Sequence, residues 1–97
     1  MWLLKTDDGA DPELTFRILP GNTKTMGRAP QAEFIVDAAL VSRFHCRVSA
    51  GANELEVVDL DSTNGTFVNG SRIEKRATLK PGDRLGVGRV ELVVSSA

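Results

Sequence analysis

The stretch Asp61-Ser62-Thr63-Asn64-Gly65-Thr66-Phe67-Val68-Asn69-Gly70 contains the dipeptide Asn-Gly twice. Asn-Gly is the strongest short-range signal for a β-hairpin, because a type I′ turn needs a positive φ at both of its central residues. Two such turns would leave only Thr66–Val68 for the strand between them. Each dipeptide therefore needs its own explanation.

The second dipeptide fits a hairpin turn and the first does not. Thr66–Val68 and Ser71–Ile73 flank Asn69-Gly70 as the two strands of a tight hairpin. By contrast, Asn64-Gly65 follows Leu60–Thr63, a polar run that is too long for a two-residue loop. We therefore predict that the first dipeptide belongs to a constrained polar loop, the kind of segment that often carries function.

Alternation of apolar and polar residues continues outward from this stretch. It is clear in Leu14–Leu19 and His45–Ala50, and Trp2–Leu4, Glu54–Val57 and Val90–Val94 are further β-rich runs. Turn residues punctuate these runs at short intervals, and no window has a sustained helical period. Many short strands predict an all-β sandwich or barrel. No linker or repeat divides the chain, so residues 1–97 are expected to form a single domain.

Composition narrows the function classes. The formal net charge of −1 provides no overall attraction to nucleic acid or to an anionic membrane, so any anion site must be built locally. The lone Cys46 excludes an internal disulfide, and with His45 it cannot complete a structural zinc site. Met1–Lys5 is too short for a signal peptide or membrane span. We expect no metal or cofactor, and a cytoplasmic location, or a nuclear one if the host has a nucleus.

Three polar segments could build such an anion site. Met26–Ala29, Ser42–His45 and Ser62–Gly65 each adjoin a predicted strand and offer guanidinium, hydroxyl or amide donors. An arginine presents a planar fork that matches phosphate oxygens, and serine and threonine add short donors. If these loops converge, they make a small site for an anion such as phosphate.

In order and spacing, these segments resemble the forkhead-associated (FHA) domain pattern at Gly27-Arg28, Ser42-x-x-His45, Ser62–Thr66 and Val68–Gly70. The resemblance continues to Leu79–Asp83 and Val87-Gly88, so it covers most of the chain. It implies a β-sandwich of about eleven strands that binds phosphothreonine peptides through loops at one end, without catalysis.

The same resemblance implies the biological setting. The chain would be a phosphothreonine-peptide-binding adaptor module of a larger protein, acting in Ser/Thr kinase signalling. Its partners would be a phosphothreonine-containing protein and the upstream Ser/Thr protein kinase, with no direct contact to nucleic acid or membrane. The alternative is a structural or oligomerisation sandwich that has lost phosphate binding, which the intact Arg28, Ser42 and Asn64 argue against.

Carried onto this sequence, the resemblance assigns five contact residues. Arg28 would be the principal phosphate-binding guanidinium, and Arg43 a flanking contact. Ser42 and Thr63 would offer hydroxyls near the phosphate, while Asn64 would hold the backbone of the bound peptide. Selectivity for the residue three places after the phosphothreonine would fall to Leu40, Arg43 and Val87–Arg89. The two arginines would favour an acidic residue there and Leu40 an apolar one, and we lean towards the apolar residue because Arg43 would be occupied at the phosphate.

Other residues would support the site. The resemblance gives Gly27, His45 and Gly65 structural roles, with His45 bracing the loops, and Asn69 at most a peripheral peptide contact. A catalytic pairing of Ser42 with His45 would need an orienting group and an oxyanion hole, and neither is evident. We expect the basic cluster of Arg72, Lys75 and Arg76 to be a solvated surface or, alternatively, a surface that steers an acidic phosphopeptide towards the site.

Overall fold

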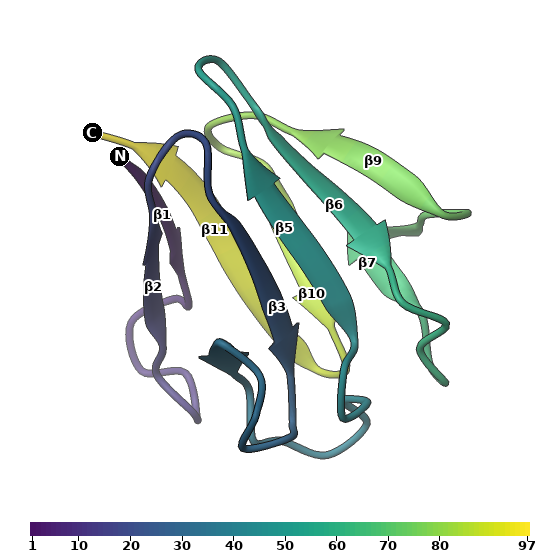
Figure 1. Ribbon diagram of the computed structural model, residues 1–97. Coiled ribbons are helices and arrows are strands. Elements are labelled where there is room, and N and C mark those ends of the chain that lie inside the picture. Colours follow the sequence, from purple (N-terminus) through teal and green to yellow (C-terminus); the bar gives the residue numbers. More distant parts are fainter.

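The computed structural model describes all residues, 1–97, as strands and loops without a helix. The strands are β1 (Trp2–Lys5), β2 (Thr15–Ile18), β3 (Thr23–Gly27), β4 (Phe34–Ile35), β5 (Cys46–Ala50), β6 (Leu55–Asp59), β7 (Thr66–Val68), β8 (Ser71–Arg72), β9 (Arg76–Leu79), β10 (Arg84–Val87) and β11 (Val90–Ser96). They form a six-stranded sheet, β2-β1-β11-β10-β7-β8, and a five-stranded sheet, β4-β3-β5-β6-β9, packed face to face (Figure 1). The predicted all-β sandwich of eleven strands is confirmed. No helix has the length and hydrophobicity needed to span a membrane.

The core lies between the two sheets and follows from the alternation. Cys46, Val48 and Ala50 of β5 all point inward, as the sequence predicts, and each is buried. Burial raises the pKa of the Cys46 thiol to about 12, with a smaller contribution from the carboxylate of Asp59, so this side chain is an inert part of the core. The rings of Phe16 and Phe34 stack with centroids 4.6 Å apart and join the edge strands β2 and β4.

The predicted hairpin is also confirmed. Strands β7 and β8 pair antiparallel with Val68 opposite Ser71, which leaves Asn69 and Gly70 as the two loop residues. Their φ angles are 51° and 83°, both in the left-handed region that a type I′ turn requires.

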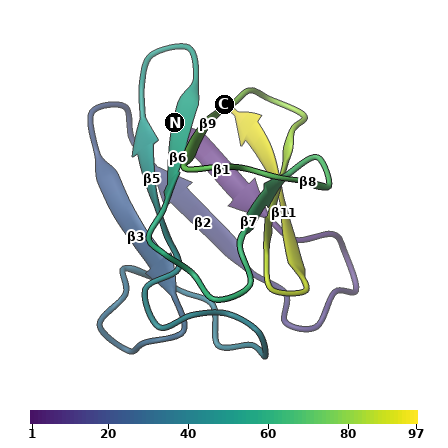
Figure 2. The ribbon, with the colours of Figure 1, turned by 90° about the vertical axis from the view of Figure 1, so that its right-hand side faces the viewer.

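The loops and the chain ends lie at opposite ends of the sandwich. The β3–β4, β4–β5, β6–β7 and β10–β11 connections gather at the lower end in Figure 1, and the two termini lie together at the upper end. Figure 2 shows the same separation after a quarter turn. The amide of Ala97 donates to the carbonyl of Met1 at 2.9 Å, which ties the two ends together. The three polar segments of the sequence therefore all lie at one end of the molecule.

Candidate functional site

The three polar segments meet in one pocket of about 500 Å³. It is lined by Arg28, Leu40, Val41, Ser42, Arg43, Asp61, Thr63 and Asn64. The structure thus brings together all five residues that the sequence predicts as peptide contacts. It places Leu40, a predicted selectivity residue, on the same wall and adds Val41 and the carboxylate of Asp61, which the sequence reasoning did not assign to the site.

Arg28 is held by the neighbouring loop and still has donors to spare. Its amide donates to the carbonyl of Ser42 at 3.0 Å, and its Nε donates to the carbonyl of Val41 at 3.1 Å. The two terminal nitrogens of the guanidinium make no hydrogen bond within the protein. An arginine fixed through Nε in this way can offer its terminal nitrogens to an anion as a pair.

Gly27 allows this loop to approach the end of β3 closely. A Cβ atom at Gly27 would lie 2.1 Å from the carbonyl oxygen of Arg43, closer than any real contact. The approach is secured by the amide of His45, which donates to the carbonyl of Met26 at 2.8 Å. A side chain at Gly27 would therefore push the Ser42–His45 segment away from Arg28.

His45 is fully buried and joins two of the three loops. Its Nδ1 accepts the amide N–H of Ser42 at 3.0 Å, and its Nε2 lies 2.8 Å from the carbonyl oxygen of Gly65. Because an amide can only donate, Nδ1 is the acceptor and the ring proton is on Nε2. Both ring nitrogens are thus engaged with backbone groups, which leaves neither to act as a base on the Ser42 hydroxyl.

Two further hydrogen bonds interlock the loops at the pocket wall. The Ser42 Oγ accepts the amide N–H of Thr63 at 3.0 Å, and the Asn64 Nδ2 donates to the carbonyl of Leu40 at 3.1 Å. The Ser42 hydroxyl keeps its own proton for another acceptor. The Oδ1 of Asn64 and the hydroxyl of Thr63 have no partner in the protein. These groups remain available to a ligand.

A carboxylate beneath the loop, which the sequence reasoning missed, fixes the loop from inside. Asp59 accepts hydrogen bonds from the hydroxyls of Ser62 and Thr66 and from the amide of Ser62, and the Ser62 Oγ in turn accepts the amide N–H of Gly65. Desolvation alone would raise the pKa of Asp59, but these donors together lower it below its ordinary value. The spacing Asp-x-x-Ser, in which an aspartate caps a nearby turn, is the signal that could have identified it.

Asn69 lies outside the pocket. Its Nδ2 donates to a carboxylate oxygen of Asp83 at 3.1 Å, and its Oδ1 accepts the amide N–H of Arg84 at 2.9 Å. Both ends of the amide are therefore engaged with the start of β10. The peripheral peptide contact expected of Asn69 stays a prediction that this geometry does not favour.

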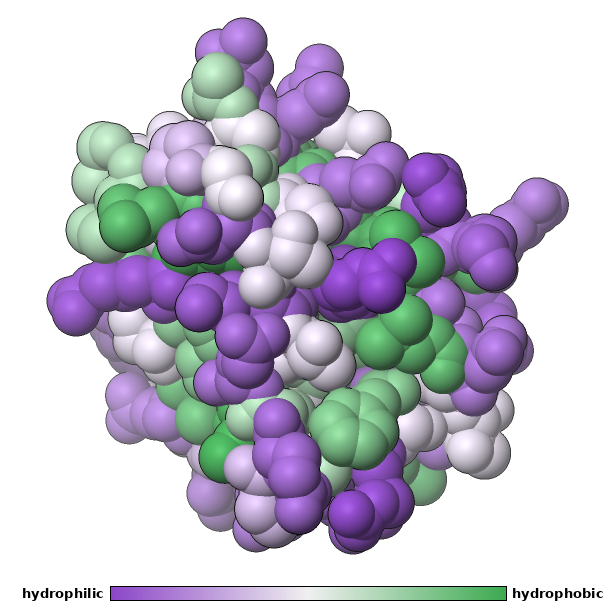
Figure 3. Space-filling view, in the orientation of Figure 1, coloured by the Kyte–Doolittle hydropathy of each residue, from purple (hydrophilic) through white to green (hydrophobic).

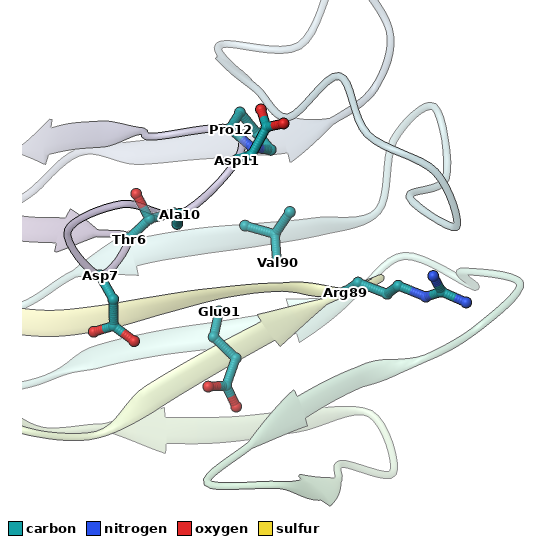
Figure 4. A pocket seen from close by; sticks show the side chains of 8 residues that line it. All are labelled: Thr6, Asp7, Ala10, Asp11, Pro12, Arg89, Val90 and Glu91. Carbon is teal, nitrogen blue, oxygen red and sulfur yellow. The ribbon is translucent and has the colours of Figure 1, made fainter.

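A second hollow at the loop end has the opposite character (Figure 4). It measures about 290 Å³ and is lined by Thr6, Asp7, Ala10, Asp11, Pro12, Arg89, Val90 and Glu91. Three of these residues are carboxylates, and the side chain of Arg89 extends away from them in Figure 4. A phosphate would be repelled here, so the pocket around Arg28 is the anion site of choice.

Comparisons with known proteins agree with this geometry. Residues 24–88 match the FHA domain family. The chain is 37% identical over 76 residues to an oxoglutarate dehydrogenase inhibitor of Corynebacterium efficiens, a match covering 78% of this chain and 53% of that protein. It spans about half the length of this curated relative.

Two solved structures are also similar over nearly the whole chain. The FHA domain of the CT664 protein from Chlamydia trachomatis superposes with a TM-score of 0.91 at 30% identity, covering 99% of this chain and 97% of that one. A structure from a structural and functional analysis of phosphothreonine-dependent FHA domain interactions gives a TM-score of 0.86 at 30% identity, covering 99% and 96%.

Proposed function

Because the chain belongs to the FHA domain family, we propose that it binds phosphothreonine-containing segments of partner proteins through the pocket around Arg28. It acts as an adaptor that reads the product of a Ser/Thr protein kinase, and it performs no catalysis. The similar FHA structure with phosphothreonine-dependent interactions supports this proposal. The kinase and the phosphorylated partner are the two proteins that this function requires.

The observation that carries the proposal is the set of unused donors in one pocket. A phosphothreonine brings roughly −1.5 to −2 charges and three acceptor oxygens. The terminal nitrogens of Arg28 and the hydroxyl protons of Ser42 and Thr63 have no protein acceptor and line the same pocket. Charge-assisted hydrogen bonds of this kind are about twice as strong as neutral ones. The pocket therefore provides both the charge and the short donors that a phosphate monoester needs.

Asn64 supplies the grip on the peptide backbone. Its Nδ2 is already tied to the carbonyl of Leu40, which fixes the plane of the amide and leaves Oδ1 to accept a backbone N–H from the ligand. A phosphate bound at Arg28 and a backbone N–H bound at Asn64 together define where the peptide lies. This arrangement favours recognition of a phosphorylated chain over free phosphate.

An oligomerisation role is less well supported. The face visible in Figure 3 is mostly hydrophilic, with hydrophobic side chains in separate small patches. A sandwich face that pairs stably with a second copy would bury a broad apolar area. The donor-lined pocket, on the other hand, has a direct use in phosphopeptide binding.

The test is calorimetric titration with matched peptides that differ only in the phosphate on one threonine. We expect binding to require the phosphate, and Arg28→Ala to weaken it at least about tenfold, because loss of a charged hydrogen-bond partner costs roughly 1.5 to 3 kcal/mol. Arg47→Ala, which removes an exposed arginine on the outside of β5, is the matched control and should bind normally. Equal affinity for both peptides would refute the proposed function.

A further inference from the structure

The pocket around Arg28 contains one charge of the wrong sign for a phosphate. Of its charged lining residues, Arg28 and Arg43 are cationic and Asp61 is anionic. Asp61 forms no ion pair with either arginine or with any other residue of the protein. Its carboxylate is exposed on the pocket wall and has no cationic partner within the protein.

The backbone holds Asp61 in this place. Its φ of 56° lies in the left-handed region, which aspartate and asparagine tolerate better than other side chains with a Cβ. The next residue, Ser62, is fixed by Asp59 through its amide and hydroxyl. The backbone that carries the carboxylate is thus fixed, so Asp61 stays beside the pocket when a ligand enters.

This carboxylate makes the pocket sensitive to the charge of residues beside the phosphate. An acidic residue or a second phosphate next to the bound phosphothreonine would approach Asp61 and be repelled. A lysine or arginine would pair with Asp61 and offset the excess negative charge that the phosphate and Asp61 together have over Arg28 and Arg43. Repulsion of acidic residues and attraction of basic residues therefore both favour ligands with basic residues beside the phosphate.

Resting on the proposed function, we propose that Asp61 is a specificity-determining residue. It selects phosphothreonine segments with a lysine or arginine close to the phosphorylated residue, and it discriminates against acidic neighbours and adjacent second phosphates. The ligand class is thus a basic phosphothreonine segment, such as a kinase that favours basic substrates would produce.

The experiment scans one fixed phosphothreonine peptide with Lys, Ala or Glu at each flanking position in turn, at low and at moderate salt. Asp61→Asn removes the charge and keeps a side chain that tolerates the left-handed backbone. The matched control is Asp37→Asn, which removes an exposed aspartate from the β4–β5 connection outside the pocket. Circular dichroism verifies that both variants fold.

For the wild type we expect Lys to be preferred over Glu at one or more positions by about 1.5- to fivefold, the range of exposed charge pairs, and the preference to shrink at higher salt. Asp61→Asn should remove most of this preference, while Asp37→Asn should keep it. Phosphate-dependent binding with no charge preference, or equal loss of preference in both variants, would overturn this inference and leave the proposed function intact. Binding that ignores the phosphate would overturn both.

Discussion

The two Asn-Gly dipeptides have the same letters and different structures. At Asn69-Gly70 both residues have positive φ, and a Cβ atom on Gly70 would meet nothing within 4 Å. At Asn64-Gly65 only the glycine has positive φ, 88°, and a Cβ atom there would lie 2.6 Å from the Arg72 side chain. Gly65 is buried and crowded by Arg72, whereas Asn69 and Gly70 are both exposed.

The difference lies in what holds each turn. Asn69-Gly70 takes the conformation that its own sequence prefers, between two strands that it connects directly. Asn64-Gly65 is held by side chains outside the turn: the distant His45 binds the carbonyl of Gly65, and the nearby Ser62 accepts the amide N–H of Gly65. The conformation of Asn69-Gly70 therefore agrees with its own turn preference and is secured by the bonds of Asn69 to Asp83 and Arg84. By contrast, Asn64-Gly65 departs from the type I′ pattern and depends on hydrogen bonds from outside the turn. The turn with imposed geometry is the one that lines the pocket.

The largest effect on stability is expected from His45→Ala, which removes the side chain that binds the Gly65 carbonyl. The substitution leaves the Ser42 amide and the Gly65 carbonyl without partners in a buried place, which should cost about 2 to 3 kcal/mol and lower the melting temperature by roughly 10 to 20 °C. Affinity for a phosphothreonine peptide should fall as well, because both loops lose their tie. Hydrogen exchange should speed up at the Ser42 amide far more than at the Asn69 amide of the hairpin, which donates to the carbonyl of Arg84 in β10. Unchanged stability with abolished binding would make His45 a direct ligand contact.

Alanine at each asparagine should separate recognition from folding. Asn64→Ala removes the amide that bonds Leu40 and faces the ligand, so we expect affinity to drop about tenfold, equivalent to about 1.4 kcal/mol. Asn69→Ala breaks the bonds to Asp83 and Arg84 and should lower stability without changing affinity. Titration of both folded variants with one phosphothreonine peptide measures this. An affinity loss in Asn69→Ala would restore the peripheral contact that its geometry does not favour.

Alanine at each glycine tests the same comparison, with a smaller expected effect. Gly65→Ala and Gly70→Ala each place a Cβ atom at positive φ, a strain of about 1 kcal/mol that chemical denaturation can measure. Only Gly65→Ala must also displace Arg72 and shift the loop that carries Asn64. We therefore expect similar losses of stability and a loss of affinity in Gly65→Ala alone. If both variants bind normally, the backbone at Gly65 does not shape the pocket.

The smallest expected effect is a loss of stability in acid, because each turn is supported by an aspartate: Asp59 beneath Asn64-Gly65 and Asp83 beside Asn69-Gly70. For Asp83, the amide of Lys80 and then the side-chain amide of Asn69 lower the pKa; for Asp59, hydrogen bonds lower it despite desolvation. An aspartate whose pKa is lowered by folding stabilises the fold, and this stabilisation is fully present above the pKa of the unfolded state, about 3.8. It is lost as the pH falls through the pKa of the folded state.

Melting curves between neutral pH and pH 3 check this expectation. Asp59→Asn and Asp83→Asn should each flatten the decline of stability below about pH 5. At neutral pH, only Asp59→Asn should also reduce peptide affinity, since Ser62 and Thr66 lie under the recognition loop. A decline as steep in Asp59→Asn as in the wild type would show that this carboxylate does not contribute to the acid sensitivity.

Sequence reasoning succeeded where periodicity or turn preference is local. The alternation in β2, β5 and β11 and the Asn69-Gly70 hairpin were all predictable from neighbouring residues. Four strands were not individually predicted: β3, β4, β9 and β10. Strand β4 has only two residues, and β10 contains Gly86, so neither has an alternation long enough to recognise. These strands exist because the neighbouring strands pair with them.

The pocket divides in the same way. Its arginine, hydroxyl and amide donors could be proposed from residue type and from the resemblance to FHA domains. The tautomer of His45 could not, because it depends on a contact with a loop far along the sequence. The support from Asp59 lies within a few residues of the loop, and its one local signal is the Asp-x-x-Ser spacing. Asp61 was noticed only as a neighbour of the loop. Its place on the pocket wall follows from a left-handed φ that the sequence permits without requiring.

The joined ends of the chain have a mechanical consequence. Because Met1 and Ala97 are hydrogen-bonded neighbours at the end away from the pocket, tension applied through both ends would pull on β1 and β11, which pair along four residues. Antiparallel strands pulled from one end separate one hydrogen bond at a time, like a zipper, and resist little force. A load entering at both ends would thus open the sandwich from the side opposite the ligand. The pocket loops, at the far end of the sandwich, would be the last region that the applied force disrupts.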